Sequence, residues 1–112
     1  MWNVPDERQL REIPKLYANE QLPLKDHIVH LHFFIGGCDW FIVEYDGVDT
    51  FFGYAILHGD YLNAEWGYMN FEEMKAINIH GLAIDCDLHW KKRPAGQVDK
   101  ILKGCGWIME NN

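Results

Sequence analysis

The segment from Ile28 to Ile35 alternates so regularly that it restricts the fold more than any other part of the chain. Successive side chains of a β-strand point to opposite faces, so this period of two predicts a strand with one face on the core. Gly36 and Gly37 end the strand. One parity is wholly apolar (Val29, Leu31, Phe33 and Ile35), and the other is mixed (Ile28, His30, His32 and Phe34).

A β-hairpin is expected next, because two apolar and aromatic runs flank the turn sequence "DGVD" at residues 46–49. A two-residue turn would set Glu44 opposite Asp49, and facing like charges destabilise a ladder. A cation bound between these two carboxylates would reverse that preference. Without one, we predict a four-residue loop over residues 46–49. This loop pairs Tyr45 with Thr50, Val43 with Phe52 and Phe41 with Tyr54.

Later segments predict shorter elements. Trp66 and Tyr68 flank Gly67 on one face of a short strand. Asn70 and Glu73 have the spacing of a capping box, which predicts a helix over residues 71–77. Residues 97–104 predict a last short helix that ends at Gly104. Between the two helices, Ala83, Asp85, Asp87 and His89 alternate with Ile84, Cys86, Leu88 and Trp90.

The 112 residues suit a single domain of the α+β class. We predict a mainly antiparallel sheet of four to five strands with two or three short helices. Residues 1–26 form an irregular N-terminal segment with a short helix capped by Asp6, and Ile13, Leu16 and Tyr17 turn inward. Residues 27–103 hold the sheet and the helices, and residues 104–112 form a tail.

The charge and composition exclude some classes of partner. A net charge of −7 argues against direct binding of nucleic acid or of an anionic membrane, and it suits a basic protein surface. Sixteen aromatic side chains are many for a small core, so some are expected to make contacts. Three cysteines without a C-x-x-C motif suggest a reduced, cytoplasmic setting. The charged N-terminus and the lack of a long apolar run predict neither a signal peptide nor a membrane span.

Histidines and carboxylates are the candidates for a metal site. His30 and His32 would lie roughly 7 Å apart on one strand face, a workable pair of zinc ligands. Alternating histidines also suit a half-exposed strand face, and we favour this interpretation, so no metal or cofactor is assigned. Glu44 with Asp46, and Asp85 with Asp87, could hold Mg²⁺ or Mn²⁺ together with Glu65 if their strands are neighbours. The chain has no serine, which leaves little support for a serine nucleophile.

Five ordered pieces, over roughly residues 13–98, resemble the small bacterial and mobile-element proteins of domain of unknown function family 2958. They are "IPKLYANE", "IVHLHFF", "EYDGVDTFFGY", "EWGYM" before an acidic helix, and "GLAIDCDLHW" before a proline. The resemblance implies a compact domain without established chemistry, carried on phages, plasmids and integrated elements. His32 stands where the family usually has lysine, and Cys86 where it has arginine, so neither suits a family-wide catalytic role. The matching positions are Glu44, Asp46, Gly47, Asp49, Phe52, Gly53, Glu65, Gly67, Tyr68 and Asp87.

We therefore expect a non-enzymatic interaction module that docks an acidic, aromatic surface on a protein partner. The resemblance suggests a host protein of nucleic-acid handling or defence, which the module would inhibit or modulate. The predicted binding residues are Glu44, Asp46, Asp49, Glu65 and Asp87 for charge, and Trp40, Trp66 and Tyr68 as apolar anchors. Two alternatives stay open. One is a metal-dependent hydrolase or nuclease on the same carboxylates, with His30 or His89 as base. The other is a self-associating domain that uses the tail Trp107-Ile108-Met109.

Overall fold

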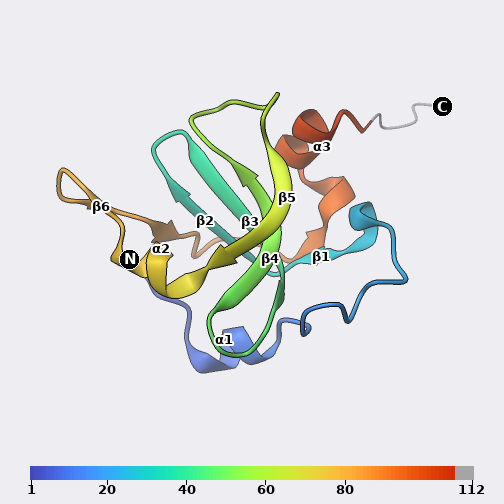
Figure 1. The fold of residues 1–112 in the computed structure, drawn as a ribbon, viewed down its shortest axis with the longest axis horizontal. Coiled ribbons are helices and arrows are strands. Elements are labelled where there is room, and N and C mark those ends of the chain that lie inside the picture. Colours follow the sequence, from blue (N-terminus) through green and yellow to red (C-terminus); the bar gives the residue numbers. More distant parts are fainter. Residues whose placement is uncertain (108–112) are drawn as a thin grey trace.

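The computed structural model describes residues 1–107, and its centre is a five-stranded antiparallel sheet in the order β5-β4-β3-β2-β8 (Figure 1). The predicted α+β class, with its antiparallel sheet and short helices, is confirmed. The sheet strands are β2 (Leu31–Ile35), β3 (Cys38–Tyr45), β4 (Thr50–Ile56), β5 (Glu65–Asn70) and β8 (Asp85–Cys86). Two small ladders pair β1 (Ile28–Val29) with β9 (Arg93–Pro94), and β6 (Asn78–Ile79) with β7 (Leu82–Ala83). The α-helices are α1 (Glu7–Arg11), α2 (Phe71–Ala76) and α3 (Asp99–Cys105), and the 3-10 helices are η1 (Leu24–Asp26) and η2 (Ala95–Gln97).

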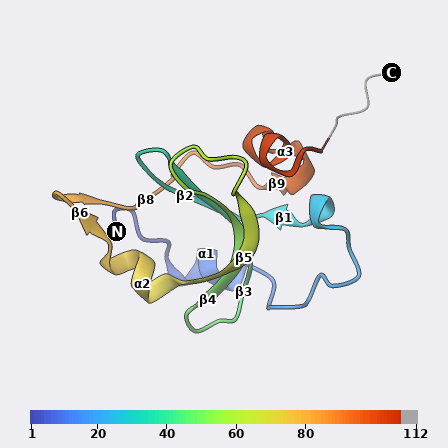
Figure 2. The ribbon, with the colours of Figure 1, turned by 45° about the horizontal axis from the view of Figure 1, so that its top comes forward.

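Both faces of the sheet are covered, each by a different part of the chain (Figure 2). The N-terminal face lies under α1 and α2, and Phe33, Phe51 and Phe71 form the middle of its core cluster. The C-terminal face lies under η2 and α3, where Phe41, Tyr54 and Ile101 are buried. His30 and His32 are half-buried, which agrees with the expected half-exposed face, although residues 90–107 fold back over the sheet on this side.

The helix signals in the sequence are confirmed at the starts of α1 and α2, but both bounds predicted for the last helix are wrong. Asn70 caps α2, since its side-chain oxygen accepts a hydrogen bond from the backbone N–H of Glu73 at 2.9 Å. Asp6 caps α1 in the same way. Residues 95–97 form η2, so α3 begins at Asp99. The last helix continues past Gly104 to Cys105 and ends at Gly106, whose φ of 66° is the left-handed conformation typical of a helix C-terminus.

The predicted strand over residues 28–35 is two strands, because pairing partners change at His30. Residues before His30 pair with β9, and residues after it pair with β3 and β8. Val29 consequently packs in the core of the C-terminal face, whereas Leu31 packs in the core of the N-terminal face. The expectation that Val29 shares one face with Leu31, Phe33 and Ile35 is thus wrong for Val29.

The alternation predicted over residues 83–90 also holds for only part of that segment. Only Asp85 and Cys86 pair with β2, and the chain then turns at Asp87, whose carbonyl oxygen accepts the backbone N–H of Trp90 at 3.3 Å. Leu88 is exposed, and Trp90 packs on the C-terminal face. The turn therefore sends Trp90 to the face opposite the one that buries Cys86.

Candidate functional site

A hollow of about 230 Å³ opens where the N-terminal segment crosses the rim of the C-terminal face. We call it the aromatic hollow. It is formed by three rings and two carboxylates, together with one buried histidine. These residues are Tyr17, Phe52, Tyr68, Glu20, Glu44 and His27. Glu44 and Tyr68 are the predicted binding residues that the structure brings together here.

A β-bulge aims Glu44 into the aromatic hollow. Residues 46–49 lie between β3 and β4 as predicted, and the pair Phe41–Tyr54 is confirmed, but the register shifts by one residue between Ile42 and Glu44. Glu44 then lies opposite Phe52, and Tyr45 lies opposite Phe51, so two of the three predicted pairs are wrong. A bulge adds one residue and re-aims the side chains that follow it.

The bulge changes which face each side chain joins. Val43 packs on the C-terminal face and Tyr45 on the N-terminal face, so Glu44 lies on the same face as Val43. Gly53 permits this geometry, since a Cβ on it would overlap the Phe41 carbonyl oxygen and lie 2.9 Å from the carbonyl carbon. The glycine in the strand is therefore a steric requirement of the bulge.

Glu44 is a buried carboxylate without a cationic side chain against it. It is only 4% exposed. Its two carboxylate oxygens accept the backbone N–H groups of Tyr17 at 3.0 Å and Asn19 at 3.3 Å. None of the ion pairs within residues 1–107 includes Glu44. A buried charge is normally paired, so the two backbone donors leave this one only partly compensated.

Two tyrosine rings stand open at the mouth of the hollow. Tyr17 is 60% exposed and Tyr68 is 56% exposed, so the expectation that Tyr17 turns inward is wrong. Tyr17 has a φ of 68°, an uncommon conformation for a residue with a side chain, and its N–H is held by Glu44. The pKa of Tyr68 is raised, first by the Tyr17 hydroxyl beside it, then by desolvation and the negative charges of Glu44 and Glu20.

His27 adds one unsatisfied polar atom to the wall of the hollow. The side chain is buried, and its Nε2 lies 3.2 Å from the carbonyl oxygen of Leu22. A carbonyl can only accept, so Nε2 donates this hydrogen bond. Nδ1 has no hydrogen-bond partner among the described residues.

A row of aromatic rings runs from the hollow towards α3. The ring centroids of Phe52 and Tyr68 are 5.2 Å apart, and those of Phe52 and Trp66 are 5.9 Å apart. Trp107 continues the row, 6.3 Å from Trp66. Phe52, Trp66 and Trp107 are each half-buried, so the row offers apolar contact area as well as packing.

The other predicted carboxylates lie outside the hollow. Oδ1 of Asp46 accepts three backbone N–H groups of its own loop, and the bonds from Thr50 and Val48 lower its pKa most. Asp49 accepts the hydroxyl of Thr50 at 3.0 Å, and Glu65 is exposed on β5. These carboxylates shape the loop or face solvent. Trp40 is half-buried against the core of the N-terminal face, so it is no anchor of the hollow.

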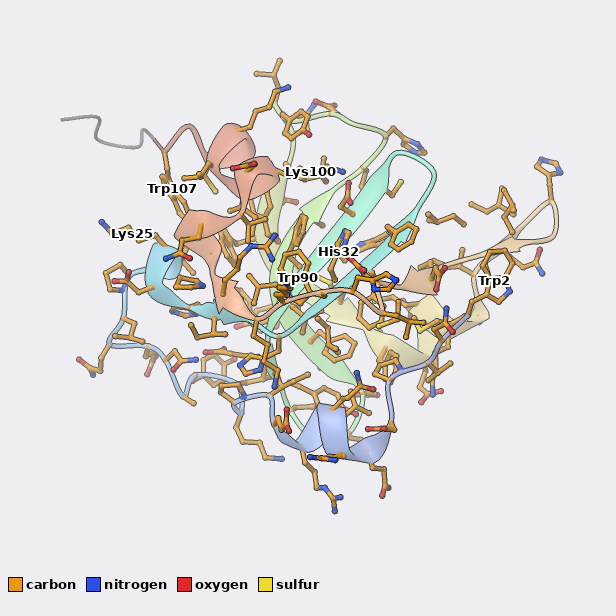
Figure 3. All side chains as sticks on the ribbon, turned by 180° about the vertical axis from the view of Figure 1, so that it is seen from behind. Trp2, Lys25, His32, Trp90, Lys100 and Trp107 are labelled. Carbon is orange, nitrogen blue, oxygen red and sulfur yellow. The ribbon has the colours of Figure 1, made fainter. Side chains whose placement is uncertain are left out.

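Asp87 belongs to a separate ionic network beneath α3. The two ring nitrogens of His32 face the carboxylates of Asp39 at 2.7 Å and Asp87 at 3.1 Å. Lys100 of α3 donates to the second oxygen of Asp39 at 3.0 Å. Figure 3 shows His32 beside Trp90, with Lys100 on the helix above them.

Hydrogen bonds and stacking satisfy this network internally. The His32 ring stacks on Phe41, with centroids 4.6 Å apart and planes 7° apart. Burial would raise the pKa of Asp39, but the bonds from His32 and Lys100 outweigh it and lower that pKa. The pKa of Asp87 is lowered in the same way, as the His32 bond and the His89 N–H overcome desolvation. The network therefore fastens α3 to the sheet.

His30 and His32, the candidate zinc ligands, contact different groups in the structure. His30 lies near Lys92 and Glu12, and burial followed by the Lys92 charge lowers its pKa. His32 instead lies in the Asp39 network. Across residues 1–107, no group of three or more histidine, cysteine, aspartate or glutamate side chains has the arrangement of a metal site.

Two further predictions concern the C-terminal tail and the absence of a membrane span. Trp107 packs with the core of the C-terminal face, whereas Ile108 and Met109 lie outside the described residues, so tail-mediated self-association stays a prediction. In the described part of the chain, no helix has the length and apolar character that a bilayer crossing requires.

Comparisons with protein-family models, curated proteins and solved structures gave no match. The resemblance to family 2958 therefore stays a prediction. The functional argument rests on the residues of this chain. Sequence reasoning found Glu44 and Tyr68 and named Phe52 among the positions that match family 2958, but it missed Tyr17 and His27 as site residues. The signal that could have helped is Gly53, since an isolated glycine in a strand pattern indicates a bulge.

Proposed function

We propose that this chain is a non-enzymatic interaction module that docks on a basic surface of a protein partner. The aromatic hollow and the row of Phe52, Trp66 and Trp107 beside it would form the contact surface. The observation that carries the proposal is Glu44, a buried carboxylate that no cationic side chain of the described residues neutralises. A positive group from a partner would complete its surroundings.

The composition of this surface supports a protein partner. Tyrosine and tryptophan are enriched at interface hot spots, and Tyr17 and Tyr68 already stand more than half exposed. The chain carries a net charge of −7, which favours encounter with a basic surface and disfavours direct contact with nucleic acid. The aromatic rings would anchor the partner, and the charge of Glu44 would orient it.

The biological setting is the part of the proposal that comes from the resemblance to family 2958. It suggests a mobile-element protein whose partner handles nucleic acid or serves host defence, and which this module inhibits or modulates. We place the protein in the cytoplasm, a setting supported by the free thiols of Cys38, Cys86 and Cys105. No observation on residues 1–107 favours the hydrolase alternative.

Affinity capture from host lysate tests the proposal. The bait is the full chain, and parallel baits carry Tyr68→Ala in the hollow or Trp2→Ala outside it. Figure 3 shows Trp2 on the opposite side of the molecule from Lys25, whose neighbour Leu24 lines the hollow. We expect one basic partner that elutes between about 0.1 and 0.5 M salt, because screening shortens the range of charge attraction. Tyr68→Ala should lose it and Trp2→Ala should retain it. Equal capture by Tyr68→Ala, or salt-independent capture, would contradict the proposal.

A further inference from the structure

The geometry points to an arginine side chain of the partner protein as the occupant of the aromatic hollow. This inference rests on the proposed function, since it names the group that the hollow receives. It goes further, because it assigns one residue type and one binding mode. Three features of the hollow select the guanidinium group: the buried carboxylate of Glu44, the arrangement of the rings and the absence of lysine and arginine from the lining that residues 1–107 provide.

Glu44 supplies the charge and the remaining acceptor sites. A carboxylate has about four lone-pair sites, and two are used here by the N–H groups of Tyr17 and Asn19. Among the described residues, one lone-pair site on each oxygen is therefore left without a hydrogen bond. A guanidinium presents two parallel N–H donors, which match two carboxylate oxygens in a fork. An ammonium presents a compact point charge without that fork.

The rings supply the walls. Phe52 and Tyr68 lie 5.2 Å apart with their planes inclined at 51°, so they form two sides of an angle instead of a closed stack. Tyr17 stands at the mouth, more than half exposed. A guanidinium stacks on aromatic faces and is more weakly hydrated than an ammonium, so it loses less on entering a ring-lined hollow.

No lysine or arginine side chain of the described residues lines the hollow. Lys15, the cation nearest in sequence to Tyr17, lines a different hollow beside Tyr45 and Gly47. The carboxylates of Glu20 and Glu44 are the charged groups of its lining. The wall of the hollow is therefore negative. A ligand that carries several N–H donors and a positive charge is complementary to it.

Three blocked tripeptides test the inference by NMR titration of the full chain: acetyl-Gly-Arg-Gly-amide, the lysine analogue and the citrulline analogue. Citrulline keeps the shape of arginine without its charge. We expect the arginine peptide to bind about tenfold more tightly than the citrulline peptide, with the largest amide shifts at Tyr17, Asn19 and Phe52. Tyr68→Ala should weaken arginine binding by about tenfold. Trp2→Ala should leave it unchanged.

Each outcome decides the inference. Equal binding of the citrulline peptide would overturn the cationic occupant, and equal or tighter binding of the lysine peptide would overturn the choice of arginine. No shift with any peptide would also overturn it. Salt-sensitive capture of a partner could still succeed in that case, so the proposed function would stand alone. Glu44→Gln removes the charge and should abolish the preference for arginine over citrulline. If the Glu44→Gln variant does not fold, the weaker arginine binding expected of Tyr68→Ala still tests the inference.

Discussion

Gly53 offers the sharpest test of the bulge that aims Glu44. The perturbation is Gly53→Ala, which adds one methyl group on a central strand. The new Cβ would overlap the Phe41 carbonyl oxygen and lie 2.9 Å from its carbonyl carbon and 3.1 Å from the Cα of Ile42. All three are backbone atoms, so a side-chain rotation cannot relieve the clash.

The expected cost follows from what the strands must do. To make room, β3 and β4 must separate at the bulge, which breaks two or three ladder hydrogen bonds of about 1 kcal/mol each. Overpacking of the surrounding core adds about 1–3 kcal/mol. We therefore expect a loss of about 3–6 kcal/mol, a large part of the roughly 5–15 kcal/mol that stabilises a typical domain.

Gly67 provides a matched control, because it lies directly opposite Gly53 on β5. A Cβ at Gly67 meets no atom within 4 Å, so Gly67→Ala should be neutral or stabilise by up to about 1 kcal/mol. The assay is urea unfolding of both variants, followed by tryptophan fluorescence. Free energies of unfolding that differ by less than about 1 kcal/mol between the two variants would refute the bulge and its steric argument.

Three other predictions concern the ionic network and one helix cap. Asp39→Asn should cost about 2–3 kcal/mol in urea unfolding, because it breaks the buried bonds to His32 and Lys100; a loss below about 0.5 kcal/mol would contradict that role. Because the pKa values of Asp39 and Asp87 are lowered in the folded state, the stability they confer is present above roughly pH 4 and is lost as the pH falls further. Denaturation from pH 7 to pH 3 should show this loss, and Asp39→Asn should show a smaller one; identical slopes would count against the network. Asn70→Ala should cost about 1 kcal/mol through the lost cap, and Asn70→Asp should cost less than half of that.

Local chemistry made much of the fold predictable. Asn70 with Glu73 determined where α2 begins, and the repulsion between Glu44 and Asp49 argued correctly against a two-residue turn, since residues 46–49 lie between β3 and β4. These signals act over a few residues, so they need no knowledge of the rest of the chain. The confirmed α+β class follows from them and from strand alternation.

Alternation failed where a distant segment changes the partners of a strand. Nothing local to His30 says that the preceding residues pair with Arg93 and Pro94. The bulge at Val43 likewise places two consecutive side chains, Val43 and Glu44, on the same face of the sheet. Glu44 then lies opposite Phe52. A single inserted residue reverses every later assignment, because the side-chain period of a strand is two.

The candidate site was predictable only in part for the same reason. Glu44 and Tyr68 stood out by type, but their meeting with Tyr17 depends on how the N-terminal segment crosses the sheet. Asp46 and Asp87 were grouped with them by charge. In the structure Asp46 caps its own loop, and Asp87 pairs with His32. Charge alone does not reveal which carboxylates are already satisfied.

The central claim is that Glu44 faces the aromatic hollow as a carboxylate that a partner cation completes. The most direct measurement is the carboxyl ¹³C signal of Glu44, recorded while the arginine tripeptide is added. We predict a saturable shift of this signal in step with the amide signals of Tyr17 and Asn19, and no shift with the citrulline tripeptide. A Glu44 signal that stays fixed while the peptide binds, or moves equally with citrulline, would contradict the account.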